Sequence, residues 1–240
     1  MVRVKTGPRK GCGVPRQPAL YYPASDGDVA EVARLIAKGA SIDAVSCDRR
    51  MTALHKASSR NHLEVVRLLL NKGAQVDKED CFKNTALHLA SLHGCLEIVR
   101  HLIDKGARVH AENEDKYTPL HRASFNGHHE VVRLLIDKGA SVDAIDNGGW
   151  TPLHCAAYSS HLETARLLVH AGARDVRAKN HFGCTPSELA QSLHVRANPG
   201  RGAIVTMLDS LRRSRRVDYA ALASRGTKRA RAALLLADGE

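Results

Sequence analysis

The residues of this 240-residue chain that could bind a metal ion are its 14 histidines and 6 cysteines. A zinc site draws on ligands a few positions apart, as in Cys-x-x-Cys, and no two of these cysteines fall within four residues of each other. His129-Glu130 resembles the opening of His-Glu-x-x-His, but Arg133 stands where the second histidine would be. We therefore expect no metal site and no cofactor, and cysteines that are small, reduced side chains.

Carboxylates also recur, and a pair of them could serve as a general acid and a general base. Each recurring glutamate, however, precedes an arginine by three residues, which is the spacing of an ion pair on a helix surface. The pairs are Glu64 and Arg67, Glu97 and Arg100, Glu130 and Arg133, and Glu163 and Arg166. The chain also contains neither Gly-x-Ser-x-Gly nor Gly-x-x-x-x-Gly-Lys-[Ser/Thr]. We expect a protein that is not an enzyme.

The positive charge of the chain, formally +11, is concentrated at its two ends. Residues 1–18 hold five basic residues and no acidic one, and residues 212–240 hold eight basic and three acidic residues. The body between them is nearly neutral, which argues against a nucleic-acid-binding body, because such a body needs a basic face or stripe. We expect residues 1–18 to form a disordered tail.

A repeat of 33 residues organises the body of the chain. Its first marker is Thr-Ala-Leu-His or Thr-Pro-Leu-His, at Thr52, Thr85, Thr118 and Thr151. A second marker resembles His-Leu-Glu-Val-Val-Arg-Leu-Leu-Leu, and it begins at His62, Cys95, His128 and His161. The third marker is Gly-Ala, which recurs at Gly39, Gly73, Gly106, Gly139 and Gly172. Three markers in constant phase indicate a repeat protein.

Each marker predicts a local structure. Threonine suits a helix N-cap, and proline after it suits the first helical position. Leu54 and Ala57 then mark the buried stripe of a short first helix, and Val65 and Leu69 mark that of a second helix. Gly73 suits the left-handed residue at a helix end, and the polar segment before the next threonine predicts a turn.

This pattern resembles the ankyrin repeat, which implies an all-α solenoid of stacked helix-turn-helix units with projecting β-turn fingers. The resemblance covers residues 19–211. Its units are an N-terminal capping repeat at 19–46, regular repeats at 47–79, 80–112, 113–145 and 146–179, and a C-terminal capping repeat at 180–211. In the last unit Ser187 and Glu188 replace the usual leucine and histidine, and a long loop precedes a helix expected over 203–211. At the turn tips Arg50, Lys83 and Lys116 replace glycine.

The resemblance also implies where a partner protein would bind, namely at the turn tips and on the exposed side of the first helices. The residues at those positions are Met51, Ser59, Arg60, Phe82, Leu92, His93, Asp115, Tyr117, Phe125, Asn126, Trp150, Tyr158, Ser159 and Phe182. This set holds six of the nine aromatic residues of the chain, and aromatic residues are enriched at interface hot spots. The alternative for Tyr117 and Trp150 is that they pack against the next turn and only stiffen the array.

Residues 33 apart occupy the same place in successive repeats, so two apolar rows should run along this surface. We expect Leu92, Phe125 and Tyr158 to line up along the first helices, within reach of one another. Tyr117 and Trp150 should form a parallel row. Polar residues flank these rows: Arg60, His93, Asp115 and Lys116.

The C-terminal tail, residues 212–240, contains two basic clusters that resemble a bipartite nuclear-import signal. Their members are Arg212, Arg213, Arg215, Arg216, Lys228, Arg229 and Arg231. A basic, solvated helix that continues the last repeat is an alternative, and a basic amphipathic helix that binds calmodulin or an acidic membrane is a third. No run of residues approaches the eighteen apolar positions of a transmembrane helix.

Taken together, these features predict a non-catalytic adaptor or scaffold, cytoplasmic or nuclear, that binds another protein through the concave face of the repeat array. A different class of function is also open. The protein would then be a nuclear regulator whose basic tails contact nucleic acid or chromatin while the repeats hold a protein. Nucleic acid enters either account only through the tails.

Overall fold

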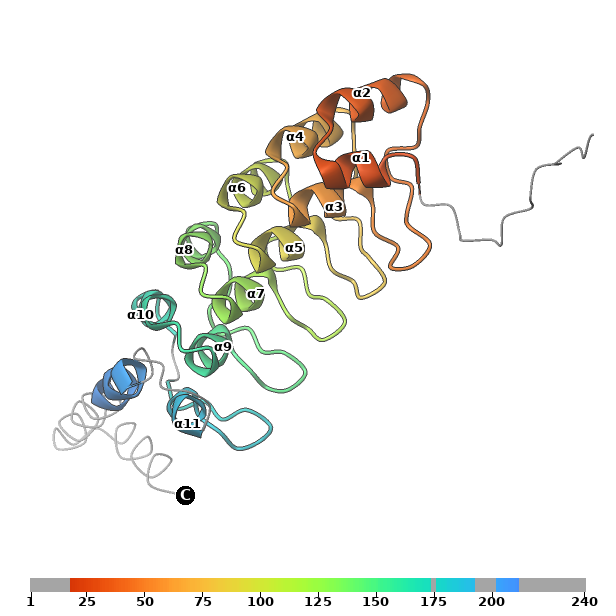
Figure 1. Cartoon of the computed structure of the whole chain (residues 1–240). Helices are drawn as coiled ribbons and strands as arrows, with labels where there is room; N and C mark the ends of the chain where they lie inside the picture. The colour runs from red at the N-terminus through yellow and green to blue at the C-terminus, as the bar shows by residue number, and fades with distance from the viewer. Residues whose placement is uncertain (1–17, 174–175, 193–201, 212–240) are drawn as a thin grey trace, which may run out of the picture.

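The computed structural model describes residues 18–173, 176–192 and 202–211 and shows a row of helix pairs (Figure 1). The helices are α1 (Tyr21–Asp26), α2 (Val29–Ala37), α3 (Ala53–Ser59), α4 (Leu63–Asn71), α5 (Ala86–Leu92), α6 (Leu96–Asp104), α7 (Pro119–Phe125), α8 (His129–Asp137), α9 (Pro152–Tyr158), α10 (Leu162–His170) and α11 (Pro186–Ser192). A further helix occupies residues 202–211. The described residues contain no strand, and the all-α prediction is confirmed.

The helices form two layers, and a row of long turns projects from one of them (Figure 1). The odd-numbered helices make one layer, in which α3 packs between α1 and α5, and α7 packs between α5 and α9. The even-numbered helices make the other layer, where α4 contacts α2 and α6. In the described part of the chain, each helix pair therefore packs mainly against its neighbours, which is the arrangement of a solenoid.

The first helix of each regular repeat begins at the predicted threonine. In α7 the Thr118 hydroxyl accepts a hydrogen bond from the backbone N–H of His121 (3.4 Å). The Nδ1 atom of His121 in turn accepts one from the backbone N–H of Thr118 (3.2 Å). This reciprocal capping box satisfies two N–H groups that a helix start leaves without partners, and Pro119 occupies the first helical position. Histidine here takes the part that glutamate or glutamine plays in most capping boxes.

The core lies between the two layers and between successive repeats. Leu120 and Ala123 of α7, and Val132 and Leu135 of α8, are completely buried. The small side chain of Ala123 allows α7 to pack closely against α5 and α9. Because a single helix pair cannot bury both of these stripes by itself, the stack is stabilised mainly by contacts between neighbouring repeats.

The projecting turns, here called fingers, are tied both internally and to each other. In the finger of residues 146–150, the Asp146 carboxylate accepts hydrogen bonds from the backbone N–H groups of Gly148 (2.8 Å) and Trp150 (2.7 Å). The Asp146 N–H closes the turn by bonding to the Trp150 carbonyl (3.0 Å). The Asn147 N–H then donates to the Asp115 carbonyl of the preceding finger (3.0 Å). The fingers therefore form one hydrogen-bonded row along the array.

At the C-terminal end, the helix expected over 203–211 is present over residues 202–211. It buries Ile204 and Leu208, and the Ser187 hydroxyl of α11 donates to the Asp209 carboxylate (2.9 Å). None of the helices in the described part of the chain is long and apolar enough to cross a membrane. The predictions for the basic segments at 1–18 and 212–240, and for the long loop before this helix, concern residues outside the described ranges, apart from Pro18 and Gly202.

Candidate protein-interaction surface

Three aromatic rings from two neighbouring repeats meet on the side of the array where the fingers project. The Phe125 ring of α7 lies 6.1 Å from the Tyr158 ring of α9, with their planes 24° apart. The Trp150 ring, at the base of a finger, lies 5.2 Å from the Tyr158 ring in an edge-on arrangement. Phe125 is 41% exposed, and Trp150 and Tyr158 are half-buried. These three residues are here called the aromatic cluster, and they confirm that Phe125 and Tyr158 line up along the first helices.

Side chains of the preceding repeat and of its own finger hold the backbone of Trp150 in place. The His121 ring donates a hydrogen bond from Nε2 to the Trp150 carbonyl (3.0 Å), and the Trp150 N–H is held by Asp146. The Trp150 ring also lies 6.3 Å from the His154 ring of α9. The tryptophan backbone is therefore fixed on both sides, so little conformational freedom would be lost on binding a partner.

Tyr117 belongs to the second expected row, and its side chain contacts both its own repeat and Asp146 of the next finger. It packs edge-on against the His121 ring (5.6 Å between centroids), and the Arg122 guanidinium lies 4.8 Å above it. Burial, reinforced by Cys155 and Asp146, raises the pKa of the Tyr117 phenol, so this group stays neutral. For Tyr117 the stiffening role named as the alternative is thus partly realised.

The other predicted contact residues are exposed or half-buried, with one exception. Arg60, Phe82, His93, Asp115 and Phe182 are exposed. Leu92, Asn126, Ser59 and Ser159 are half-buried. Phe82 and Phe182 lie on the fingers of other repeats, and no ring contact in the described part of the chain joins them to the aromatic cluster.

Met51 is the exception, because its side chain is only 6% exposed and cannot contact a partner. The residue before the capping threonine lies at the base of a finger, where the Ser46 N–H bonds to the Met51 carbonyl (2.8 Å). At the equivalent positions Tyr117 and Trp150 carry rings with a polar edge that remain half-exposed. Methionine is flexible and entirely apolar, so it is covered instead.

Two surface residues were missed by the sequence reasoning. Arg122 lies over the Tyr117 ring, and the only signal for it was its place on α7, one turn after the cap. Ile145 is 57% exposed just before the finger that carries Trp150, where the other repeats have Glu79 and Glu112. Arg122 adds to the surface beside Tyr117, whereas Ile145 takes the place of Glu79, which forms an ion pair with Arg108.

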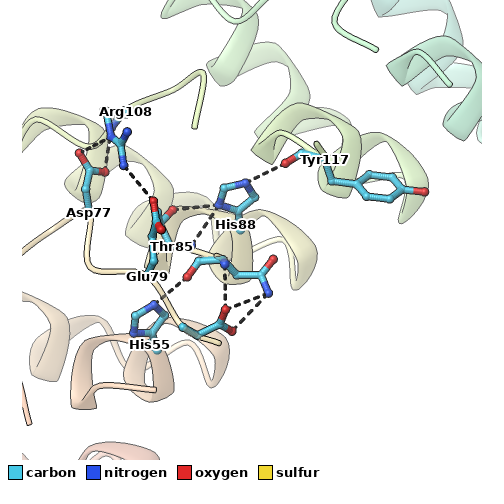
Figure 2. A network of polar contacts seen from close by, with 9 residues as sticks. His55, Asp77, Glu79, Thr85, His88, Arg108 and Tyr117 are labelled. Carbon is cyan, nitrogen blue, oxygen red and sulfur yellow. Dashed lines mark hydrogen bonds and ion pairs between the residues drawn. The ribbon is translucent and has the colours of Figure 1, made fainter. Parts of the chain in front are cut away.

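The recurring histidines form a ladder that links each repeat to the next finger (Figure 2). Nε2 of His55, His88 and His121 donates to the backbone carbonyls of Asn84, Tyr117 and Trp150, each at 3.0 Å. Their Nδ1 atoms accept hydrogen bonds from the threonine N–H groups. Burial lowers the pKa of all three rings, to about 4 for His88. Both nitrogens of each neutral ring are occupied, so these residues position fingers and do not bind metal.

Figure 2 also shows ion pairs that join two repeats on the far side of the ladder. The Arg108 guanidinium lies 3.2 Å from the Asp77 carboxylate and 3.4 Å from that of Glu79. No group of three or more histidine, cysteine, aspartate or glutamate side chains within the described ranges could hold a metal ion.

The even-numbered helices carry the expected glutamate–arginine pairs on their outer surface, with one difference. Nitrogen–oxygen distances are 3.0 Å in the Glu64 pair and 3.9 Å in the Glu97 and Glu163 pairs. In α8, however, Glu130 lies 3.5 Å from Nε2 of His129. Histidine occupies a position there that is leucine in the other regular repeats, and its ring competes with arginine for the carboxylate. All these pairs are exposed, so each contributes little to stability.

The comparison with known families agrees with this architecture. A model of ankyrin repeats, in three copies, matches residues 19–113 and 108–180. The chain therefore belongs to the ankyrin-repeat family, whose repeats are in general protein-interaction modules. No curated protein matches the chain.

Proposed function

We propose that this protein is a non-catalytic adaptor that binds another protein through the concave face of its repeat array. The observation that carries the proposal is the aromatic cluster, in which Phe125 and Tyr158 from adjacent first helices and Trp150 from a finger meet at an open surface. If these rings served only to stabilise the fold, we would expect them to be fully covered, because burying apolar surface lowers the free energy of the folded protein. A partner that covers them would gain that free energy instead.

The anatomy of the surface fits this role. A central group of rigid aromatic side chains with a polar rim is typical of an interface hot spot. The rim here contains Asn126, Asp115 and Arg122. Loss of one hot-spot ring can cost 2 kcal/mol or more, which corresponds to roughly a thirtyfold loss of affinity.

The experiment that tests the proposal is affinity capture with matched variants. Phe125→Ala and Trp150→Ala should each abolish capture of the partner while leaving helical content and melting nearly unchanged. The control, Glu130→Ala with Arg133→Ala, changes the outer surface of α8 and should leave capture intact. If both aromatic variants retain the partner, or lose it only because the array unfolds, the cluster is structural and the proposal fails.

The single tryptophan provides a second readout. Within this chain its emission reports on the aromatic cluster, so a bound partner without tryptophan should change the Trp150 spectrum in the wild type but not in Phe125→Ala. A partner that binds both proteins equally and leaves the spectrum unchanged would place the contact elsewhere.

The second candidate function is a nuclear regulator that contacts nucleic acid or chromatin through its tails. The observation that favours it is the pair of basic clusters between Arg212 and Arg231. Neutralising Lys228 and Arg229 should then move a large fluorescent fusion from the nucleus to the cytoplasm, and an unchanged distribution would return the tail to a solvated helix. DNA affinity that falls steeply with salt and is lost on deleting 212–240 would support the nucleic-acid role.

A further inference from the structure

The tips of the first three fingers share an unusual backbone conformation. Arg50, Lys83 and Lys116 occupy equivalent positions, with φ of 54°, 59° and 61°. In the next two fingers the same position is glycine, at Gly149 (φ 74°) and Gly183 (φ 73°). Glycine adopts this left-handed conformation without strain, whereas a residue with a Cβ atom does not.

The choice of residue at these tips is not explained by the turn. Asparagine and aspartate tolerate the left-handed region better than other non-glycine residues, yet all three tips carry a cation. These three side chains are here called the fingertip cations. Strained backbone that persists at a surface points towards function, and here the strain supports three exposed positive charges.

Among the described residues, no ion pair joins a fingertip cation to a carboxylate. Ion pairs in the described part of the chain involve cations such as Arg67, Arg108 and Lys138, but not Arg50, Lys83 or Lys116. Their charges are therefore available to a ligand.

The fingertip cations lie in a row that leads to the aromatic cluster. The Cys81 N–H donates to the Arg49 carbonyl (2.8 Å) and the Glu114 N–H to the Phe82 carbonyl (3.0 Å), so the three fingers are stacked side by side. Packed helices lie about 8–10 Å apart, and the row thus spans about 20 Å. The aromatic cluster lies where the repeat tipped by Lys116 meets the repeat tipped by Gly149, because Phe125 belongs to the first and Trp150 and Tyr158 belong to the second. Phe82, which is 49% exposed, adds a further apolar side chain beside Lys83.

We propose that the partner recognised by this face is an acidic protein segment that carries a bulky apolar side chain at one end. This inference rests on the proposed function. The apolar side chain packs on Phe125, Trp150 and Tyr158, and the carboxylates follow the row of fingertip cations. An extended segment rises about 3.3 Å per residue, so about six residues cover the row.

An acidic peptide fits this surface better than nucleic acid does. Glu114 and Asp115 are exposed beside Lys116 and interrupt the positive row. A polyanion with a charge at every unit would be repelled there, whereas a peptide can place a neutral or basic residue at that point. The aromatic cluster, moreover, offers apolar contact area next to the charged row.

The test uses a display library of random 15-residue peptides selected on the full chain. Selected sequences should combine several aspartates or glutamates with an aromatic or large aliphatic residue. One such peptide is then synthesised, and its affinity is measured for the wild type and for Arg50→Gly/Lys83→Gly/Lys116→Gly. Because glycine favours the backbone at these tips, this triple variant should fold at least as well as the wild type. We expect its affinity to fall about tenfold at low salt, with a smaller difference at high salt.

A variant with the same loss of charge on the other surface is the control. Arg67→Ala/Arg100→Ala/Arg133→Ala removes three cations from the even-numbered helices and should change the peptide affinity less than twofold. If both triple variants weaken binding equally, the effect comes from net charge, and the fingertip site is wrong.

Phe125→Ala separates failure of this inference from failure of the proposed function. Selected peptides that need Phe125 but carry no acidic excess would overturn the inference and leave the proposed function standing. Peptides that bind independently of Phe125 would overturn both. A 20-base-pair DNA duplex serves as the alternative ligand. If it binds more tightly than the peptides, and its affinity depends on the fingertip cations but not on Phe125, the row binds nucleic acid and the inference is overturned.

Discussion

Substitution of Gly127 by alanine tests the packing between successive repeats. Gly127 lies in the loop between α7 and α8 with a φ of 73°. A Cβ atom at this position would lie 2.3 Å from Nδ1 and 2.6 Å from Cε1 of the His161 ring. Gly27 and Gly94 approach His62 and His128 in the same way. Each of these three histidines, which precede α4, α8 and α10, therefore occupies the space above a glycine of the preceding repeat.

Two costs add up when alanine is introduced. A left-handed backbone costs a residue with a Cβ atom roughly 1 kcal/mol relative to glycine. The His161 ring must also move away from the Phe125 carbonyl, with which it makes a hydrogen bond, at a further cost of about 1–2 kcal/mol. We expect Gly127→Ala to lower the free energy of unfolding by about 2–3 kcal/mol, measured by urea denaturation followed by circular dichroism.

A double-mutant cycle isolates the steric part. The chain contains its own precedent, because Asn61 (φ 61°) takes the place of the glycine where the partner is the smaller Cys95. In a His161→Cys background, Gly127→Ala should cost only the left-handed conformation, about 1 kcal/mol. If alanine costs less than 0.5 kcal/mol in the wild type (roughly the scatter of neutral surface substitutions), or if its cost is the same in both backgrounds, the reasoning is refuted.

Three further perturbations follow from the structure. The buried hydroxyl of Ser91 has no hydrogen-bond partner in the described residues, and Ala157 occupies the equivalent position of another repeat. We therefore expect Ser91→Ala to raise the free energy of unfolding by about 1 kcal/mol. A lower free energy of unfolding would show that the hydroxyl has a partner. Ala123→Leu should overpack the contact of α7 with its neighbours and cost roughly 1–3 kcal/mol in the same melt, and no loss would contradict the stacking. Burial lowers the pKa of His88 to about 4, so the unfolded chain binds its proton first as the pH falls below about 6.5. Proton uptake by His88 in the unfolded chain should lower the free energy of unfolding by about 3 kcal/mol between pH 6.5 and pH 4. His88→Gln should make this loss smaller.

The fold could be predicted from the sequence because each repeat carries the same local signals at the same phase. Thr118 caps α7, and Gly106 follows the end of a helix at a φ of 90°, as their residue types indicate. The period of 33 residues then dictates which side chains stack. Propensity, capping and burial pattern all point to the same structure, so errors in one signal are corrected by the others.

The interaction surface could be predicted only in part, because the period gives the position of a side chain but not its packing. Met51 shares its position with Trp150, yet the flexible methionine is covered and the tryptophan is not. Arg122 turns back over Tyr117, a contact that depends on the rotamers of two side chains. Contacts of this kind are set by three-dimensional packing, which a one-dimensional repeat does not encode.

The position of the partner on the array is the central claim, and site-specific photocrosslinking in cells tests it most directly. A photoreactive benzoyl-phenylalanine would replace Phe125, in the aromatic cluster, or Glu130, on the outer surface of α8. The account predicts that position 125 crosslinks to a partner protein, that the crosslink is lost when Trp150→Ala is added, and that position 130 gives none. A partner that crosslinks from position 130 and not from position 125 would contradict it.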